Sequence, residues 1–121
     1  MEWKKTPDKL VKFFEKKVAD VKCEKRKMFG YPCCFINNNM FIGTHGENLV
    51  LRLGDEDRKM AMAAHKDIVT FEPLPGRKMG EYVVVPERVR EDDTLFDRLL
   101  KQSVKYASSL PAKERKKRGS K

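Results

Sequence analysis

Residues 25–53 read KRKMFGYPCCFINNNMFIGTHGENLVLRL, a series of short apolar runs separated by residues that favour turns. The triplet at positions 37–39 suits a hairpin, because Asn adopts left-handed backbone more readily than most residues that have a Cβ atom. The leucines at positions 49, 51 and 53 occupy every second place, which is the period of a strand. The connections are too short for parallel crossovers, so this stretch predicts an antiparallel meander.

A helix is predicted before the meander. Thr6 is placed to cap it, Pro7 suits the first helical position, and Asp8 complements the positive end of the helix dipole. The apolar residues that follow recur at steps of three and four, as expected for one buried helix face. They are Leu10, Phe13, Phe14, Val18 and Val21.

After the meander, a run of acids at positions 55–57 predicts the start of a short helix that ends near His65. Residues 70–71 are expected to be briefly extended, and Pro75 and Gly76 suit the central positions of a type II turn. The β-branched and aromatic stretch 82–85 predicts the last strand.

The acids at positions 91–93 open a final predicted helix. Its apolar stripe is expected to dock on the sheet and consists of Leu95, Phe96, Leu99, Leu100, Val104 and Ala107. The residues together predict an α+β fold in which an antiparallel sheet is flanked by helices.

The composition fits one domain. The chain has 121 residues, 40% of them hydrophobic with seven Phe, and 37% charged. No apolar run approaches the roughly 18 residues of a membrane span, and the first residues do not resemble a secretory signal, so we expect a cytoplasmic protein. We divide the chain into a folded domain, residues 1–110, and a basic tail, residues 111–121.

Positive charge is concentrated at the two ends of the chain. Residues 1–27 hold ten bases and five acids, residues 28–110 hold eleven and twelve, and residues 111–121 hold six and one. The tail has no large apolar residue to bury, so we expect it to be disordered. Such a block either contacts nucleic acid by neutralising phosphates or acts as a solubilising end, and the sequence leaves both open.

If the protein contacts nucleic acid, the basic ends are expected to carry the binding by charge alone. No element that reads bases is apparent, so binding should depend weakly on nucleotide sequence. The candidate residues are Lys16, Lys17, Lys113, Arg115, Lys116, Lys117 and Arg118. The alternative for the two helix lysines is an ordinary solvated face.

The other chemical signals are weak. Cys33 and Cys34 are adjacent and therefore point to opposite faces of a strand, so we expect reduced thiols without a metal ion. Cys23 could approach them in space, which leaves redox sensing as an alternative. Neither His45 nor His65 belongs to a ligand or catalytic pattern, and we expect no cofactor, no metal and no enzymatic activity.

Several segments in order resemble one family: KMFG at residues 27–30, MFIG at 40–43, NLVLRL at 48–53, FEPLPGRKM at 71–79 and YVVVP at 82–86, followed by a helix through Tyr106 and Ala107. This series is similar to the N-terminal domain of the TfoX (Sxy) regulators in its stand-alone form. The resemblance covers roughly residues 9–110. It implies an α-β(3)-α-β(2)-α order and supplies no catalytic motif.

TfoX regulators act in natural competence together with a transcription factor of the cyclic-AMP receptor type. Full regulators carry a second, helical domain, so the resemblance implies only the first of their two modules here. The chain departs from the family at residues 31–34 (YPCC), where another Gly and apolar residues are usual. We therefore expect a non-catalytic module in transcription-linked regulation that binds a protein or a nucleic acid. The alternative is a protein-interaction or self-associating module, for example a homodimer, with no nucleic-acid role.

Overall fold

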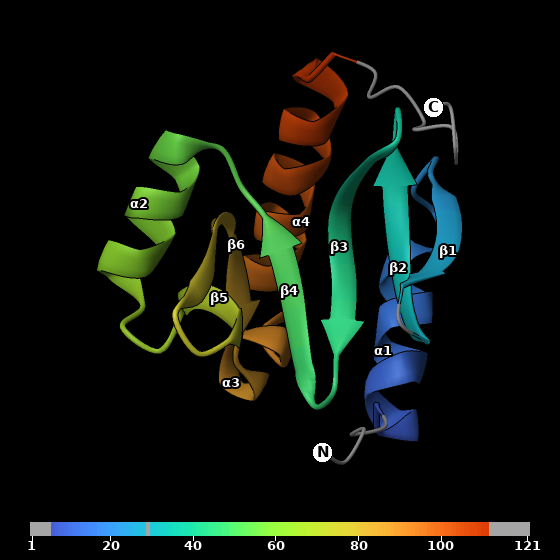
Figure 1. Cartoon of the computed structure of the whole chain (residues 1–121), viewed down its shortest axis with the longest axis horizontal. Coiled ribbons are helices and arrows are strands. Elements are labelled where there is room, and N and C mark those ends of the chain that lie inside the picture. Colours follow the sequence, from blue (N-terminus) through green and yellow to red (C-terminus); the bar gives the residue numbers. More distant parts are fainter. Residues whose placement is uncertain (1–5, 29, 112–121) are drawn as a thin grey trace.

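The computed structural model describes residues 6–28 and 30–111 (Figure 1). The helices are α1 (Asp8–Val18), α2 (Asp55–Ala64), α3 (Glu87–Arg90) and α4 (Asp93–Ser109). The strands are β1 (Glu24–Met28), β2 (Tyr31–Ile36), β3 (Asn39–His45), β4 (Asn48–Arg52), β5 (Val69–Leu74) and β6 (Arg77–Val85). The predicted α+β class, with an antiparallel sheet and flanking helices, is confirmed.

The six strands form one sheet in the order β1-β2-β3-β4-β6-β5, and every neighbouring pair is antiparallel. The meander therefore contains four strands, one more than the family order implies. The additional strand, β1, has the sequence EKRKM, which carries no apolar alternation for a pattern to detect. Its pairing with β2 extends from Glu24 opposite Phe35 to Met28 opposite Tyr31.

Two predicted turns are present. Asn37 and Asn38 have φ angles of 53° and 64° and link β2 to β3, so both adopt the left-handed backbone that a tight hairpin requires. Gly76 has a φ angle of 81° between the paired residues Leu74 and Arg77, which matches its predicted place in the β5–β6 turn.

The helices α1 and α4 pack on the same face of the sheet, behind it in the view of Figure 1. The core on this face joins helix residues such as Phe14 and Phe96 to strand residues such as Ile42 and Leu51, all at most 2% exposed. The Ser103 hydroxyl donates a hydrogen bond of 2.9 Å to the carbonyl of Phe41, which fixes α4 against β3.

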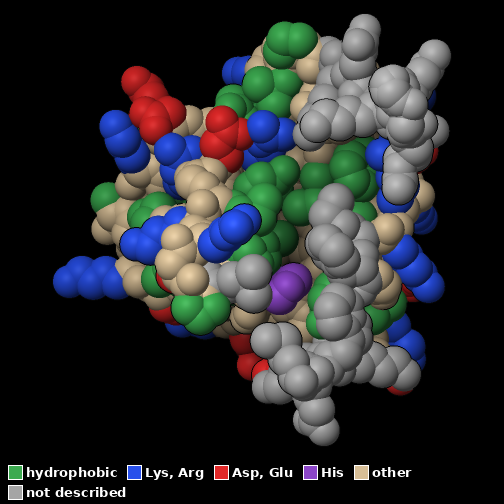
Figure 2. Space-filling view, in the orientation of Figure 1, with side chains coloured by type: hydrophobic (Ala, Val, Ile, Leu, Met, Phe, Trp, Pro, Cys, Tyr) green, Lys and Arg blue, Asp and Glu red, His purple; other side chains and the backbone are tan. Residues whose placement is uncertain are grey.

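The opposite face of the sheet is also apolar, and Figure 2 shows hydrophobic side chains at its centre. Buried residues that do not belong to the helix-side core include Tyr31, Val50 and Phe71. The His45 ring lies 5.1 Å from the Tyr31 ring and 5.3 Å from the Phe71 ring. Because β3 and β5 would lie about 14 Å apart in a flat sheet, this contact shows that the sheet curls.

The helix starts differ in part from expectation. Thr6 does not cap α1: its buried hydroxyl lies 3.3 Å from the Thr44 hydroxyl, and Pro7 occupies the N-cap position without a side-chain hydrogen bond. The start of α4 is as predicted, and Asp92 caps it by accepting a hydrogen bond of 3.1 Å from the Leu95 amide. The one-turn α3 was not predicted. None of the described helices is long and apolar enough to cross a membrane.

Candidate nucleic-acid interface

The two helix lysines predicted to contact phosphate have different environments. Lys16 is exposed, whereas the side chain of Lys17 is only 11% exposed. The Lys17 ammonium lies 3.1 Å from the Asp93 carboxylate and 3.0 Å from the Asp97 carboxylate. Burial opposes the charge of this amine, but hydrogen bonds to Asp97 and Asp93 outweigh it and raise the pKa of Lys17.

Lys17 also lies over two aromatic rings, 5.7 Å from the centre of Phe13 and 5.6 Å from the centre of Phe96. A charge that is held between two carboxylates and two ring faces has little attraction left for an outside phosphate. We therefore assign Lys17 to the contact between α1 and α4 and keep Lys16 in the candidate interface.

The tail residues Lys113, Arg115, Lys116, Lys117 and Arg118 lie outside the described residues, but the position from which the tail departs is defined. The carbonyl of Pro111 accepts a hydrogen bond of 3.1 Å from the side-chain amide of Asn39. The same amide also donates to the Asn37 carbonyl at 3.2 Å. The chain therefore reaches its basic tail at the β2–β3 turn.

That turn lies beside β1. The Arg26 guanidinium, which comes from β1, donates to Asn38 at 2.6 Å and to Glu24 at 2.7 Å and stacks over the Phe35 ring at 4.4 Å. The hydrogen bond to Glu24 raises the pKa of Arg26 and keeps its charge in place. Pro111, where the tail begins, and Arg26 of β1 therefore lie at the same β2–β3 turn.

Lys16 is one of five exposed lysines on three consecutive segments: α1, the link that follows it, and β1. All five are exposed, and none has an ion-pair partner among the described residues. We name them the basic edge: Lys12, Lys16, Lys22, Lys25 and Lys27. Figure 2 shows Lys and Arg side chains along the right-hand side of the molecule, where Figure 1 places β1.

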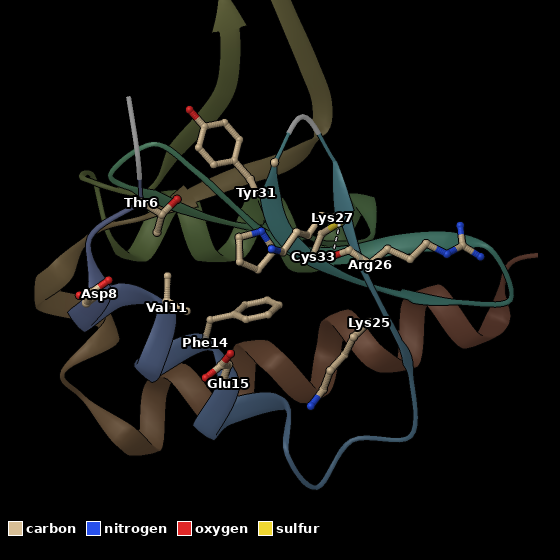
Figure 3. Close-up of a pocket in the computed structure, with 12 residues that line it drawn as sticks. Thr6, Asp8, Val11, Phe14, Glu15, Lys25, Arg26, Lys27, Tyr31 and Cys33 are labelled. Carbon is tan, nitrogen blue, oxygen red and sulfur yellow. Dashed lines mark hydrogen bonds between the residues drawn. The ribbon is translucent and has the colours of Figure 1, made fainter. Parts of the chain in front are cut away.

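A groove of about 490 Å³ lies between α1 and the β1–β2 hairpin (Figure 3). Its lining includes Val11 and Phe14, while Asp8 and Glu15 occupy the helix side. Figure 3 shows that the Arg26 side chain runs along the hairpin and away from this space. Lys25 and Lys27 line the hairpin side of the groove, opposite these two carboxylates, and both lysines are exposed. Because the carboxylates would repel a phosphate inside the groove, the chemistry favours anion binding where Lys25 and Lys27 face solvent.

The structure also contains a cluster that the sequence did not reveal. Glu81 on β6 accepts hydrogen bonds from Arg52 at 2.7 Å and from the Tyr106 hydroxyl at 3.0 Å. The Arg52 guanidinium lies between the rings of Tyr82 and Tyr106, at 5.5 Å and 5.7 Å. The members are up to 54 positions apart in sequence, from 52 to 106, so no local spacing signals the cluster. All its charges are satisfied internally, and it joins the end of α4 to the sheet.

His65 and the acids at positions 92–93 take part in contacts that stabilise the fold. The Arg88 guanidinium is paired with Asp67 at 2.7 Å and lies 3.4 Å from the His65 ring, and the acids at positions 92–93 cap α4 and hold Lys17. Within residues 6–28 and 30–111, no three His, Cys, Asp or Glu side chains form a group that could hold a metal ion.

Comparison with known proteins gives one match. The family model described as the TfoX N-terminal domain matches residues 18–107 of the 121-residue chain. No curated protein and no solved structure matches.

Proposed function

The chain belongs to the TfoX N-terminal domain family, and from this premise we propose that it is a non-catalytic, cytoplasmic regulatory module that binds nucleic acid through the phosphate backbone. The observation that carries the proposal is the basic edge, where five exposed lysines lack ion-pair partners among the described residues. The tail starts near the same end of the sheet and adds six bases against one acid.

The spacing on β1 suits a polyanion. Lys25 and Lys27 are two positions apart on a strand, so they lie on the same side and about 6.8 Å apart. One strand of a duplex presents a phosphate for about every 3.4 Å of helix axis, so both ammonium groups reach phosphates of one backbone. Lysine binds phosphate as a point charge and carries no base information. We expect non-specific binding with a Kd of about 10⁻⁴–10⁻⁶ M at physiological salt.

The regulatory part of the proposal is supported by family membership. TfoX regulators act with a transcription factor, and a module that holds nucleic acid by charge could bring such a factor and its promoter together. The N-terminal module would then supply affinity, and its partner would supply the reading of bases.

A second candidate is a protein-interaction or self-associating module. It is favoured by exposed apolar side chains at the other end of the sheet, where Met60, Val69 and Met79 are 70%, 48% and 39% exposed. This candidate requires no nucleic acid.

The test compares two charge reversals of equal size in the full chain. K25E/K27E reverses two basic-edge residues, and K66E/K78E reverses two exposed lysines elsewhere on the surface. Binding of a labelled duplex is measured by fluorescence anisotropy between about 50 and 200 mM salt. We expect K25E/K27E to weaken binding at least about tenfold and to lower the salt slope by about 2, and K66E/K78E to change affinity by less than about threefold.

Circular dichroism confirms that both variants are folded. Equal losses in the two variants would show that net charge, and not the basic edge, controls binding. No detectable binding by the unaltered chain at low salt would favour the protein-interaction candidate.

A further inference from the structure

The chain enters α1 at the wall of the groove that lies between this helix and the β1–β2 hairpin (Figure 3). Thr6 is buried, and its hydroxyl donates to the Thr44 hydroxyl at 3.3 Å. The Thr44 hydroxyl donates in turn to the Pro32 carbonyl at 3.3 Å. Because Thr6 and Pro32 both line the groove, these contacts fix the point beside it from which the residues before Thr6 leave the fold.

The helix wall of the groove carries two carboxylates without a counterion. Asp8 and Glu15 are exposed on α1, and neither has an ion-pair partner among the described residues. Val11 lies between them at steps of three and four, so all three side chains share one helix face. An ammonium or N–H group that comes to rest on Val11 therefore has an acceptor on either side.

The space between the walls is apolar. The residues that form it are the half-buried Val11 and the buried Phe14, Tyr31 and Cys33. Figure 3 shows the Phe14 ring pointing from α1 toward the hairpin. Cavities of about 300–1,000 Å³ enclose small organic molecules, so a groove of about 490 Å³ has room for one large aromatic side chain.

The chain itself has a segment of complementary chemistry. Residues 1–5 read MEWKK; they lie outside the described residues and contain the only Trp of the sequence, followed by Lys4 and Lys5. A Trp side chain has about 150–250 Å² of surface to bury and one N–H that requires a partner when buried. The indole thus matches the apolar space, and the N–H and the two ammonium groups match the carboxylates of the helix wall.

The length of the segment keeps Trp3 close to the groove. Trp3 precedes Thr6 by three positions, and three extended residues span at most about 10–11 Å. A short tether of this kind gives an effective concentration in the millimolar range, which a separate peptide or a second copy of the chain does not reach in dilute solution. The segment is therefore favoured over these other occupants.

We propose that residues 1–5 dock in the groove, with the Trp3 indole packed on Val11 between α1 and the β1–β2 hairpin. The docked segment links the start of α1 to β1, an edge strand that pairs only with β2. Lys25 and Lys27 remain on the opposite side of the groove, so this inference does not depend on nucleic-acid binding.

The single Trp makes the test direct, because all indole fluorescence of the full chain comes from Trp3. We expect an emission maximum at shorter wavelength than that of N-acetyl-tryptophanamide. We also expect a quenching constant for acrylamide, a neutral quencher, that is at least about threefold lower. Nuclear Overhauser effects between the indole protons and the Val11 methyl groups should locate the ring.

Two pairs of variants place the docking site. V11N puts an amide into the apolar space and should remove most of the protection from acrylamide, whereas V104N makes the same change at a half-buried valine of α4 outside the groove and should keep it. E15K reverses one exposed carboxylate of the helix wall and should also reduce protection. Its control is D20K, at an exposed acid outside the groove. Circular dichroism checks that each variant is folded.

Emission and quenching equal to those of N-acetyl-tryptophanamide in the unaltered chain would overturn the proposal. Equal losses of protection in V11N and V104N would do the same, since the effect would then not come from the groove. Protection that disappears on dilution would also overturn it and would identify a second copy of the chain as the occupant.

Discussion

The two edge strands of the sheet, β1 and β5, are protected in different ways. A strand at a sheet edge leaves backbone N–H and C=O groups that can pair with another chain. On β1 the protection is charge, since the strand reads EKRKM. On β5, which reads VTFEPL, it comes from Pro73 and from two shifts in the pairing with β6.

The β1 edge and the β5 edge of the sheet, which we call its two ends, therefore have different chemistry. Charge discourages a second strand at β1 and at the same time attracts a polyanion. Proline and irregular pairing discourage a second strand at β5 but leave Val69 and Met79 exposed. If the two edges are independent, changes at one should not alter the property measured at the other.

Removal of the tail should have the largest effect. Deletion of residues 112–121 removes six bases and one acid. We expect duplex affinity to fall about 100-fold at low salt and the salt slope to decrease by about 3 to 5, because each phosphate contact contributes about 0.9 to the slope. The measurement is the same anisotropy titration with the full and shortened chains.

The fold should survive this deletion, since the described core ends before it. Unchanged circular dichroism and unfolding midpoint are the controls. An affinity equal to that of the full chain would remove the tail from the interface and leave only the basic edge.

The next largest effect is expected on the free energy of unfolding when one ion pair at each end of the sheet is removed. The side chains of the Arg52–Glu81 pair are 19% and 44% exposed, and the pair also receives the Tyr106 hydroxyl. We expect E81Q to lower the free energy of unfolding by about 1–2 kcal/mol, with its partial exposure keeping the cost at this level. E24Q, which alters the more exposed Arg26 partner at the β1 edge, should cost less than about 0.5 kcal/mol in the same urea titration.

The contribution of Glu81 to the free energy of unfolding should depend on pH. Burial acts to raise the pKa of Glu81, but the hydrogen bonds from Arg52 and Tyr106 outweigh it and hold the pKa below its ordinary 4.5. The unfolded chain therefore takes up this proton first as pH falls, so the stabilisation is complete above about pH 4.5 and is lost below it. E81Q should flatten stability in this acid range, and a parallel decline in both proteins would contradict the assignment.

Lys16 and Lys17 provide a contrast between neighbours within the N-terminal basic region. K16M should weaken duplex binding about five- to eightfold and leave stability within about 0.5 kcal/mol, because Lys16 is exposed. K17M should leave binding within about twofold and lower stability by about 1 kcal/mol, because it removes contacts to Asp93 and Asp97. The reverse pattern in paired titrations would return Lys17 to the interface.

The sequence predicted those features that local rules determine. The hairpin at positions 37–38, the turn at Gly76 and the start of α4 each depend on neighbouring residues, and all are present. Alternation and helical periodicity also located the main core. The number of early strands was less well defined because β1 is held by backbone pairing to β2 and by few apolar contacts.

The candidate site was harder to predict because its geometry is long-range. Nothing near Lys17 in sequence indicates that Asp93, 76 positions away, neutralises it. The contact between Pro111, where the tail begins, and the β2–β3 turn is one hydrogen bond from Asn39, across 72 positions. Charge counting identified the basic ends, but only the folded chain shows where the tail begins and which lysine is already paired.

The smallest effects are expected at the β5 end. V69T/M79Q replaces two partly exposed apolar side chains with uncharged polar ones, and Thr keeps the strand preference at position 69. Unfolding free energy should stay within about 0.5 kcal/mol, because surface substitutions of this kind remove little buried area. Duplex affinity should stay within about twofold, since no charge changes at any salt concentration. Sedimentation at high protein concentration is the sharper measurement: any concentration-dependent rise in mass should be lowered by V69T/M79Q and unchanged by K25E/K27E. A loss of duplex binding in V69T/M79Q, or of self-association in K25E/K27E, would show that the two ends of the sheet form one surface.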